Sequence, residues 1–339
     1  MTIHMITGAS LSGMPEVVRS ELGPLAERRA FRSAGLTPTV LTTENAFIPE
    51  TALVGFIDSV ARQAGTEHIG LAISRCLSIT RYGTWGRYVL EGETLGESMA
   101  RFNAGISMHA SYSTFDVEED AGLAWIKYRF AVSGEGGYVN LAFCAAGILI
   151  DYVRQYVNTD WVPDVIELDV PRPTTLATIE DAFPCRIRFD APRLGVGFNP
   201  ALLRSPRRCP LPEKLTTLTD VSRARQNGPP TDVEGVVREL VRVQVRAGTV
   251  NLDSAARALC YGTRRLQRAL ERGGSSFREI VRSVRLETAK ELIAQTKLPF
   301  STIGAQLGYS DKCHFSRAFR RDAGCTPGEY RTRYGNMFL

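Results

Sequence analysis

The chain has 339 residues, 44% of them hydrophobic, with seven cysteines and a formal net charge of +5 at pH 7. This length supplies two domains of ordinary size and excludes a small disulfide-stabilised scaffold. We expect a cytoplasmic protein, because no stretch approaches the roughly 20 apolar residues of a membrane helix and no opening segment resembles a secretory signal. The cysteines form no C-x-x-C pair, so we expect neither disulfides nor a metal site and interpret them as reduced, mostly buried thiols.

The basic charge is concentrated in the C-terminal third of the chain. Residues 231–339 hold 19 Lys and Arg against 11 Asp and Glu, a net charge of +8, whereas residues 1–230 carry −3. This asymmetry favours a polyanionic partner for the last third and a different role for the rest. Helix-breaking and basic residues are frequent between Pro200 and Pro230. We therefore predict domains at 1–210 and 231–339, joined by a linker at 211–230 that contains a short helix.

Apolar spacing in the N-terminal part is mixed. Residues 106–112 and 126–132 alternate as half-buried strands do, with a polar turn at 118–122 between them. Residues 50–63 and 141–157 have the apolar spacing of helices. We therefore predict an α+β domain that contains an antiparallel hairpin.

After Pro230 the pattern becomes helical throughout, beginning with a helix capped by Thr231 or Asp232. A short helix capped by Asn251 then ends near residue 259, residues 260–262 interrupt it, and residues 263–271 resume the pattern. A helix, a tight turn and a second helix of these lengths predict a helix-turn-helix unit. Its outward-facing polar side chains are Arg264, Arg265, Gln267 and Arg268.

The same arrangement repeats after a long amphipathic helix at 277–296, which Pro299 ends. Ser301 is expected to cap residues 302–307, Gly308 to form the turn, and Ser310 to open a helix at 311–322. The long helix spans about 30 Å, close to the pitch of about 34 Å of B-DNA. Two reading helices can therefore enter successive major grooves. The outward-facing side chains of the second are Lys312, His314, Ser316, Arg317 and Arg320.

The segment from Ile303 to Arg331 reads IGAQLGYSDKCHFSRAFRRDAGCTPGEYR. It resembles the signature of the AraC/XylS family of bacterial transcription regulators, and the resemblance extends over about residues 231–334. It implies an all-α domain with two helix-turn-helix units on promoter DNA. Side chains at positions where family members approach base edges or phosphates are Arg264, Arg268, Lys312, Cys313, His314 and Arg317. Cys260 and Gly262 stand where many members have Gly and Ser, so we expect the first unit to be looser.

Five N-terminal segments, at 32–36, 68–71, 82–86, 186–189 and 200–203, resemble more weakly the arabinose-binding-type sensor domain of one branch of this family. The resemblance covers about residues 20–210 and implies binding of a small-molecule effector and dimerisation. We expect no cofactor. Aromatic side chains are suited to line an apolar ligand pocket. Those we expect there are Tyr82, Trp85, Tyr88 and Trp125.

These patterns together predict a ligand-responsive, sequence-specific DNA-binding regulator, a homodimer that activates transcription with RNA polymerase and is not an enzyme. The alternative is a cysteine-dependent DNA-alkylation repair methyltransferase, since DNA-binding domains of this type also occur in such proteins. That chemistry needs a zinc-ligated cysteine cluster or an activated thiol, and neither the cysteines nor the four histidines show such spacing. A non-specific DNA-compacting protein would leave the acidic N-terminal part without a role.

Overall fold

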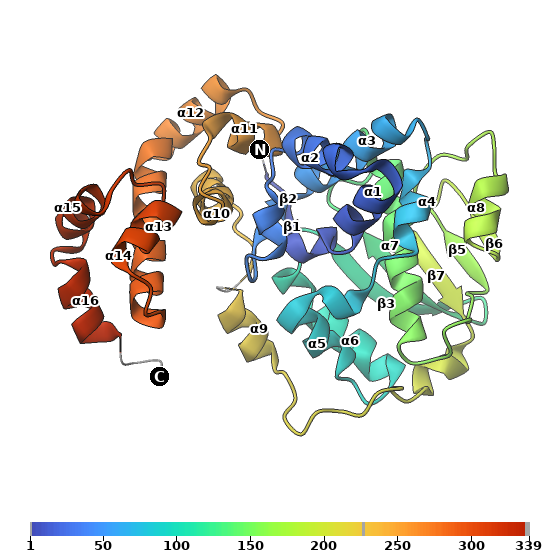
Figure 1. The fold of residues 1–339 in the computed structure, drawn as a ribbon. Helices are drawn as coiled ribbons and strands as arrows, with labels where there is room; N and C mark the ends of the chain where they lie inside the picture. The colour runs from blue at the N-terminus through green and yellow to red at the C-terminus, as the bar shows by residue number, and fades with distance from the viewer. Residues whose placement is uncertain (1, 226–227, 336–339) are drawn as a thin grey trace. The chain divides into compact units, whose positions relative to one another are not determined.

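The computed structural model describes residues 2–225 and 228–335 (Figure 1). The chain divides into two compact units: unit 1 comprises Met1–Ala34 and Glu44–Thr231, and unit 2 comprises Gly35–Thr43 and Asp232–Leu339. The limits 1–210, 211–230 and 231–339 stay a prediction, and positions 226–227 and 336–339 within them lie outside the described residues.

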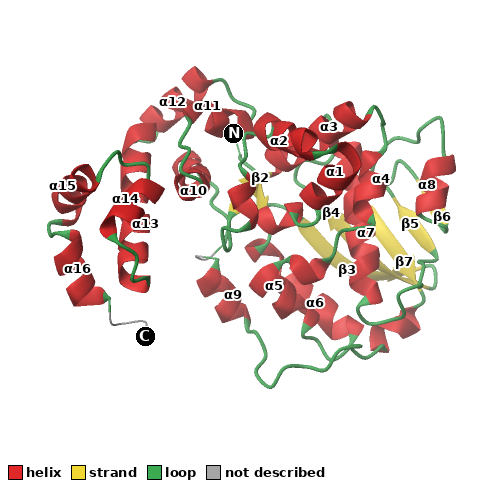
Figure 2. Cartoon of the chain, in the orientation of Figure 1, coloured by secondary structure: helices red, strands yellow, loops and turns green. Residues whose placement is uncertain are grey.

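Unit 1 combines helices with two β-sheets, so it is an α+β domain as predicted (Figure 2). Strands β1 (Met5–Thr7) and β2 (Phe47–Pro49) form a small antiparallel pair. The larger sheet has the order β3-β4-β7-β5-β6, in which only the β5–β6 pair is parallel. Its strands are β3 (Thr114–Asp120), β4 (Leu123–Arg129), β5 (Val165–Glu167), β6 (Arg186–Arg188) and β7 (Leu194–Phe198).

The helices of unit 1 supply most of its buried apolar side chains. The longest is α7, whose apolar residues leave few positions exposed, and it packs against α4 and β7. The predicted helices at 50–63 and 141–157 correspond to α3 and α7. The α-helices are α1 (Met14–Leu22), α2 (Pro24–Ser33), α3 (Glu50–Ala64), α4 (Ile69–Ser74), α5 (Gly83–Leu90), α6 (Leu95–Gly105), α7 (Tyr138–Arg154), α8 (Ala177–Ala182) and α9 (Leu218–Ala224).

The predicted hairpin is present, but its first strand was placed wrongly. Ile106–Met108 form a 3₁₀ turn after α6, and the strand is β3 at Thr114–Asp120. The predicted polar turn at 118–122 belongs largely to β3, and the turn itself is at Ala121 and Gly122, both in the left-handed region. Strand β3 lies at the edge of the sheet and carries exposed acidic side chains, which oppose pairing with the edge of another sheet. These charges replace the alternation of apolar and polar residues by which a strand is usually recognised.

Unit 2 is helical throughout its described residues, with two helix-turn-helix pairs, α11–α12 and α14–α15, connected by α13 (Figure 1). Asp232 caps α10 and Asn251 caps α11, each through a side-chain oxygen that accepts a backbone N–H. The helices are α10 (Val233–Arg246), α11 (Leu252–Ala258), α12 (Thr263–Arg272), α13 (Phe277–Gln295), α14 (Phe300–Gln306), α15 (Lys312–Ala323) and α16 (Pro327–Tyr334).

Two predicted caps in the second pair were wrong. Ser301 lies inside α14, whose N-cap is Pro299, and α15 is capped by Asp311 instead of Ser310. Ser301 therefore cannot accept the bonds expected of a cap, because helical geometry already begins one residue before it.

Small residues let the helices of the second pair cross closely. A Cβ atom on Gly304 of α14 would lie 3.0 Å from the Cβ of Phe315, so a larger residue would displace α15. Phe315 is 1% exposed and packs edge-on against Tyr309 and beside Phe319. In the first pair, Leu266 and Leu270 of α12 are buried in the same way. Each second helix is thus anchored by one apolar face, which fixes the side chains on its opposite face.

Candidate functional site

The outward face of α12 carries the polar side chains predicted from the sequence. Arg264, Arg265, Gln267 and Arg268 are all exposed, and Leu266 between them is buried. The guanidinium of Arg265 lies over the ring of Tyr261, 4.2 Å from its centroid, which holds this side chain at the start of the helix.

The outward face of α15 is similar. Lys312, Cys313, His314 and Arg317 are exposed and Ser316 is half-buried. The Asp311 carboxylate accepts the backbone N–H of His314 at 2.7 Å, and this bond holds the pKa of Asp311 below its usual range. The helix therefore begins in a fixed geometry directly beside its exposed basic residues.

Most cations on α12 and α15, the two helices expected to read DNA, differ in their pairing from the cations of the supporting helices α10 and α13. Arg238 and Arg246 of α10 pair with Glu287 and Glu291 of α13, each at 3.0 Å. Asp322, on the inner side of α15, binds Arg282 of α13 and also Arg321, which holds the pKa of that carboxyl well below its usual range. Within the described ranges, six exposed cations on α12 and α15 form no ion pair: Arg264, Arg268, Arg272, Lys312, Arg317 and Arg320. Exposed, uncompensated cations on a helix that fits a major groove are suited to contact phosphates and guanine.

The turns of the two helix-turn-helix units differ in strain. Gly308 has φ +78° in the second turn, whereas Cys260 has φ +54° in the first. A residue with a Cβ atom in this region costs about 1–2 kcal/mol, a cost that glycine avoids. Gly262 caps α12 with no side-chain hydrogen bond, whereas Asp311 provides one for α15. The first helix-turn-helix pair, α11–α12, is therefore held less firmly at its turn than the second pair, α14–α15.

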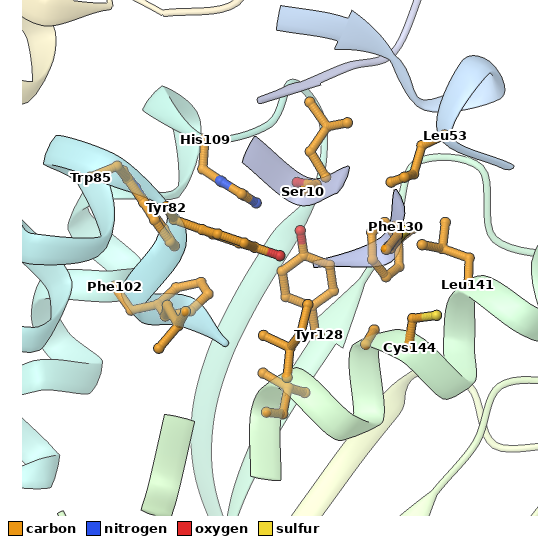
Figure 3. Close-up of a pocket in the computed structure, with 16 residues that line it drawn as sticks. Ser10, Leu53, Tyr82, Trp85, Phe102, His109, Tyr128, Phe130, Leu141 and Cys144 are labelled. Carbon is orange, nitrogen blue, oxygen red and sulfur yellow. The ribbon is translucent and has the colours of Figure 1, made fainter. Parts of the chain in front are cut away.

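Unit 1 contains a pocket of about 40 Å³ between its helices and the larger sheet (Figure 3). Its wall is almost wholly apolar, and the residues come from segments far apart in the sequence. Tyr128 of β4 contributes from the sheet, and Leu141, Cys144 and Leu149 contribute from α7. The other lining residues are Ile6, Ser10, Met14, Leu53, Ile79, Tyr82, Trp85, Phe102, His109, Phe130, Ala145 and Ile148.

One end of this pocket gathers polar atoms. The hydroxyls of Tyr82 and Tyr128 and a ring nitrogen of His109 point toward the same space beside Ser10 (Figure 3). Ser10 and His109 are each 4% exposed, and the Ser10 hydroxyl and His109 Nδ1 have no hydrogen-bond partner in the described structure. Buried polar atoms without a partner cost stability, so a bound molecule that paired with them would be stabilised at this end.

The predicted ligand residues divide into two pairs. Tyr82 and Trp85 line the pocket, and the Trp85 indole donates to the Gly105 carbonyl at 2.7 Å, which fixes its ring. Tyr88 and Trp125 are buried but are not among the lining residues. The Tyr88 ring lies under the Arg101 guanidinium at 4.4 Å, and Trp125 lies under Lys127 at 3.8 Å. Both rings therefore serve packing with a neighbouring cation.

A buried arginine lies behind the polar end of the pocket. The rings of Trp85 and His109 are stacked, with centroids 4.3 Å apart. Arg225, just after α9, lies 5.9 Å from the Trp85 ring centroid and donates to the carbonyl oxygens of Met108 at 2.6 Å and Tyr82 at 3.4 Å. It is 2% exposed, and burial lowers the pKa of its guanidinium to about 9. Burial and then the charge of Arg225 hold the pKa of His109 well below its usual range.

The cysteines are not mostly buried, so that prediction was wrong. Cys144 is the buried one, and burial raises the pKa of its thiol, whereas Cys76, Cys209, Cys260 and Cys313 are exposed. Nowhere in residues 2–225 and 228–335 do three His, Cys, Asp or Glu side chains gather in an arrangement that could hold a metal ion. Over the same residues, every helix is too short or too polar to cross a membrane.

Comparison with known proteins gives two matches to family models. Residues 25–207 match the arabinose-binding domain of AraC transcription regulators, and residues 255–333 match a helix-turn-helix domain. The ornithine utilization regulator of Pseudomonas aeruginosa is 23% identical over 322 residues, 91% of each chain. The HTH-type transcriptional regulator VirS of Mycobacterium tuberculosis is 24% identical over 341 residues, 98% of each chain. Among solved structures, the regulator CdpR of Pseudomonas aeruginosa is 19% identical, with 78% of this chain and 86% of that chain aligned at a TM-score of 0.36.

Proposed function

Because the chain belongs to the AraC family of transcription regulators and carries its arabinose-binding-type N-terminal domain, we propose that it is a ligand-responsive, sequence-specific activator. The observation that supports this best is the pair of capped or anchored helices in unit 2 with exposed, unpaired cations on their outer faces. The curated relatives are likewise regulators, so an enzyme is not the function proposed.

DNA recognition is assigned to the outward faces of α12 and α15. Arg264, Arg268, Lys312 and Arg317 offer charge to phosphates and guanine edges, and the smaller polar side chains offer hydrogen bonds to neighbouring bases. The length of α13, 19 residues or about 28 Å, is comparable to the pitch of about 34 Å that separates successive major grooves. The complete proposed set is Arg264, Arg265, Gln267, Arg268, Lys312, Cys313, His314, Ser316 and Arg317.

Replacing Arg317 by alanine is expected to weaken specific DNA binding by about 1–3 kcal/mol, because a groove contact is lost. The fold should stay intact, since Arg317 is exposed and lies opposite the buried face of α15. The measurement is a gel shift at fixed salt on a fragment that the protein itself selects from a random-sequence pool.

The matched control for Arg317→Ala is Arg246→Ala, which removes a cation from the supporting helix α10 where Glu291 already compensates it. Its affinity for the same fragment should change little. Unchanged affinity of the Arg317 variant would remove this residue from the DNA-reading face.

Unit 1 is proposed to hold the effector and to form the homodimer, through which the ligand changes how two DNA-binding units are presented to a promoter and to RNA polymerase. If the ligand prefers one arrangement, it tightens DNA binding, and DNA must in return tighten ligand binding by the same factor. The coupling free energy between two such sites is typically about 1–3 kcal/mol. We place this activity in the cytoplasm, where the resemblance to bacterial regulators puts its DNA.

A fragment of residues 231–339 is expected to fold and to bind DNA more weakly than the full chain. Its helices carry their own caps and buried faces, and loss of the second copy removes the gain from simultaneous binding. Circular dichroism and a gel shift test both points. An unfolded fragment would show either that the boundary near 228–231 is misplaced or that the fragment needs residues 35–43, which also belong to unit 2.

A further inference from the structure

The wall of the unit 1 pocket limits the chemistry of its occupant. None of its 16 lining residues is Asp, Glu, Lys or Arg, and the flat rings of Trp85 and Phe102 form much of one side. A sugar would place several hydroxyls against apolar side chains, each at a cost in lost water contacts. An ornithine-like diamine would find no carboxylate in the lining. The wall therefore suits the apolar body of a compact molecule.

The polar end supplies hydrogen-bond donors. A serine hydroxyl and a tyrosine hydroxyl both donate readily, and a histidine ring nitrogen donates in one of its two tautomers. Ser10 and His109 are the two that are buried without a partner. Acceptor oxygens on a ligand would satisfy both at once.

The charge behind this end is positive and uncompensated. Arg225 forms no ion pair within residues 2–225 and 228–335, and its Nε atom also has no hydrogen-bond partner there. A buried cation is stabilised by a nearby anion. Glu50 is not its partner, because the two carboxyl oxygens of Glu50 accept hydrogen bonds from Ser113 and the Val132 N–H, and no ion pair joins Glu50 to Arg225 among the described residues.

We propose that the effector is a compact monocarboxylic acid, whose apolar body packs against Trp85 and Phe102 and whose carboxylate binds Ser10 and His109 in the field of Arg225. This inference rests on the proposed function, in which unit 1 holds the effector. On the same measure as the pocket's 40 Å³, one water needs about 10–15 Å³, so the pocket has room for about three waters and the acid that occupies it is small.

The test is titration of the full chain with two acids and their amides, hexanoate with hexanamide and phenylacetate with phenylacetamide, alongside L-arabinose and L-ornithine. Tryptophan fluorescence is a direct readout, because Trp85 lines the pocket. At least one acid should bind ten-fold or more tightly than its amide, and arabinose and ornithine should give no change. Equal binding of acid and amide, binding of arabinose or ornithine, or binding of none of the six would overturn the inference.

Variants of Arg225 separate charge from shape. Arg225→Met should reduce the preference for acid over amide to about two-fold or less, whereas Arg225→Lys should keep part of it. The matched control, Arg223→Met in α9, the helix directly before Arg225, removes an arginine whose side chain is 75% exposed and should leave the preference unchanged. If Arg225→Met does not fold, the neutral Arg225→Gln variant replaces it, and a preference for acid over amide equal to that of the unaltered chain would contradict a role for the charge of Arg225.

Failure of this inference can be told apart from failure of the proposed function. The same preparation is used to select DNA from a random-sequence pool, with and without hexanoate or phenylacetate. Selection of a defined sequence together with no preference for acids would reject the ligand class and keep the regulator. No selected sequence under any condition would reject sequence-specific regulation itself.

Discussion

Replacing Phe315 by alanine should destabilise unit 2 by about 3–5 kcal/mol and abolish specific DNA binding, the loss expected when a buried aromatic side chain leaves a cavity. Phe315 is 1% exposed, and its Cβ lies against the position where Gly304 has no side chain. Without the ring, α14 and α15 lose the contact that sets their crossing. Thermal unfolding followed by circular dichroism, together with a gel shift, measures both effects.

The graded control is Phe315→Leu, which keeps most of the apolar volume and should cost less than about 1.5 kcal/mol. Its DNA affinity should lie between those of the alanine variant and the unaltered chain. Full DNA affinity in Phe315→Ala would mean that α15 does not need this anchor in order to read DNA.

Replacing Glu50 by glutamine should flatten the pH dependence of unit 1 stability. Burial raises the pKa of Glu50 from 4.5 to about 7, so the folded state favours the protonated carboxyl. Its contribution is fully present below pH 4.5 and is lost as pH rises through 7, because ionisation in the buried site costs free energy. The loss amounts to about 3 kcal/mol for this group at about 1.4 kcal/mol per pKa unit.

Denaturant unfolding between pH 5 and 8, followed by tryptophan fluorescence, measures the effect of Glu50→Gln. All three tryptophans lie in unit 1, so this signal reports that unit alone. Glu119→Gln, on the exposed face of β3, is the matched control and should keep the original slope. A Glu50→Gln variant that loses stability with pH as steeply as the unaltered chain would assign the dependence to other groups.

The elements of unit 2 could be predicted from the sequence because their signals are local. Asp232 and Asn251 are caps within a few residues of the helices they begin, and the apolar period identifies the buried faces. Two caps were misplaced by one or two positions, since the N-cap of α14 is Pro299, which forms no side-chain cap, and Asp311 stands next to Ser310 as a competing cap for α15. The DNA-reading residues proposed from the sequence all lie on α12 and α15, exposed or half-buried.

The pocket of unit 1 was only partly predictable. Tyr82 and Trp85 stand in an aromatic, glycine-containing segment that indicates a pocket, but Ser10, His109 and Tyr128 come from three other segments. No periodicity links residues about 100 positions apart, so tertiary packing alone brings them together. Strand β3 was missed for a different reason: its exposed acidic residues hide the alternation that normally identifies a strand.

The burial of Arg225 also determines where unit 1 can be joined to the DNA-binding domain of another regulator. Since α9 and Arg225 belong to unit 1 and contact Tyr82 and Met108, a chimera joined before residue 218 would exchange a piece of the sensor together with the DNA-reading part. A junction between Gly228 and Thr231 keeps the guanidinium with its own carbonyl acceptors. Biosensors that graft this sensor onto a foreign DNA-binding domain should therefore carry the chain through Gly228.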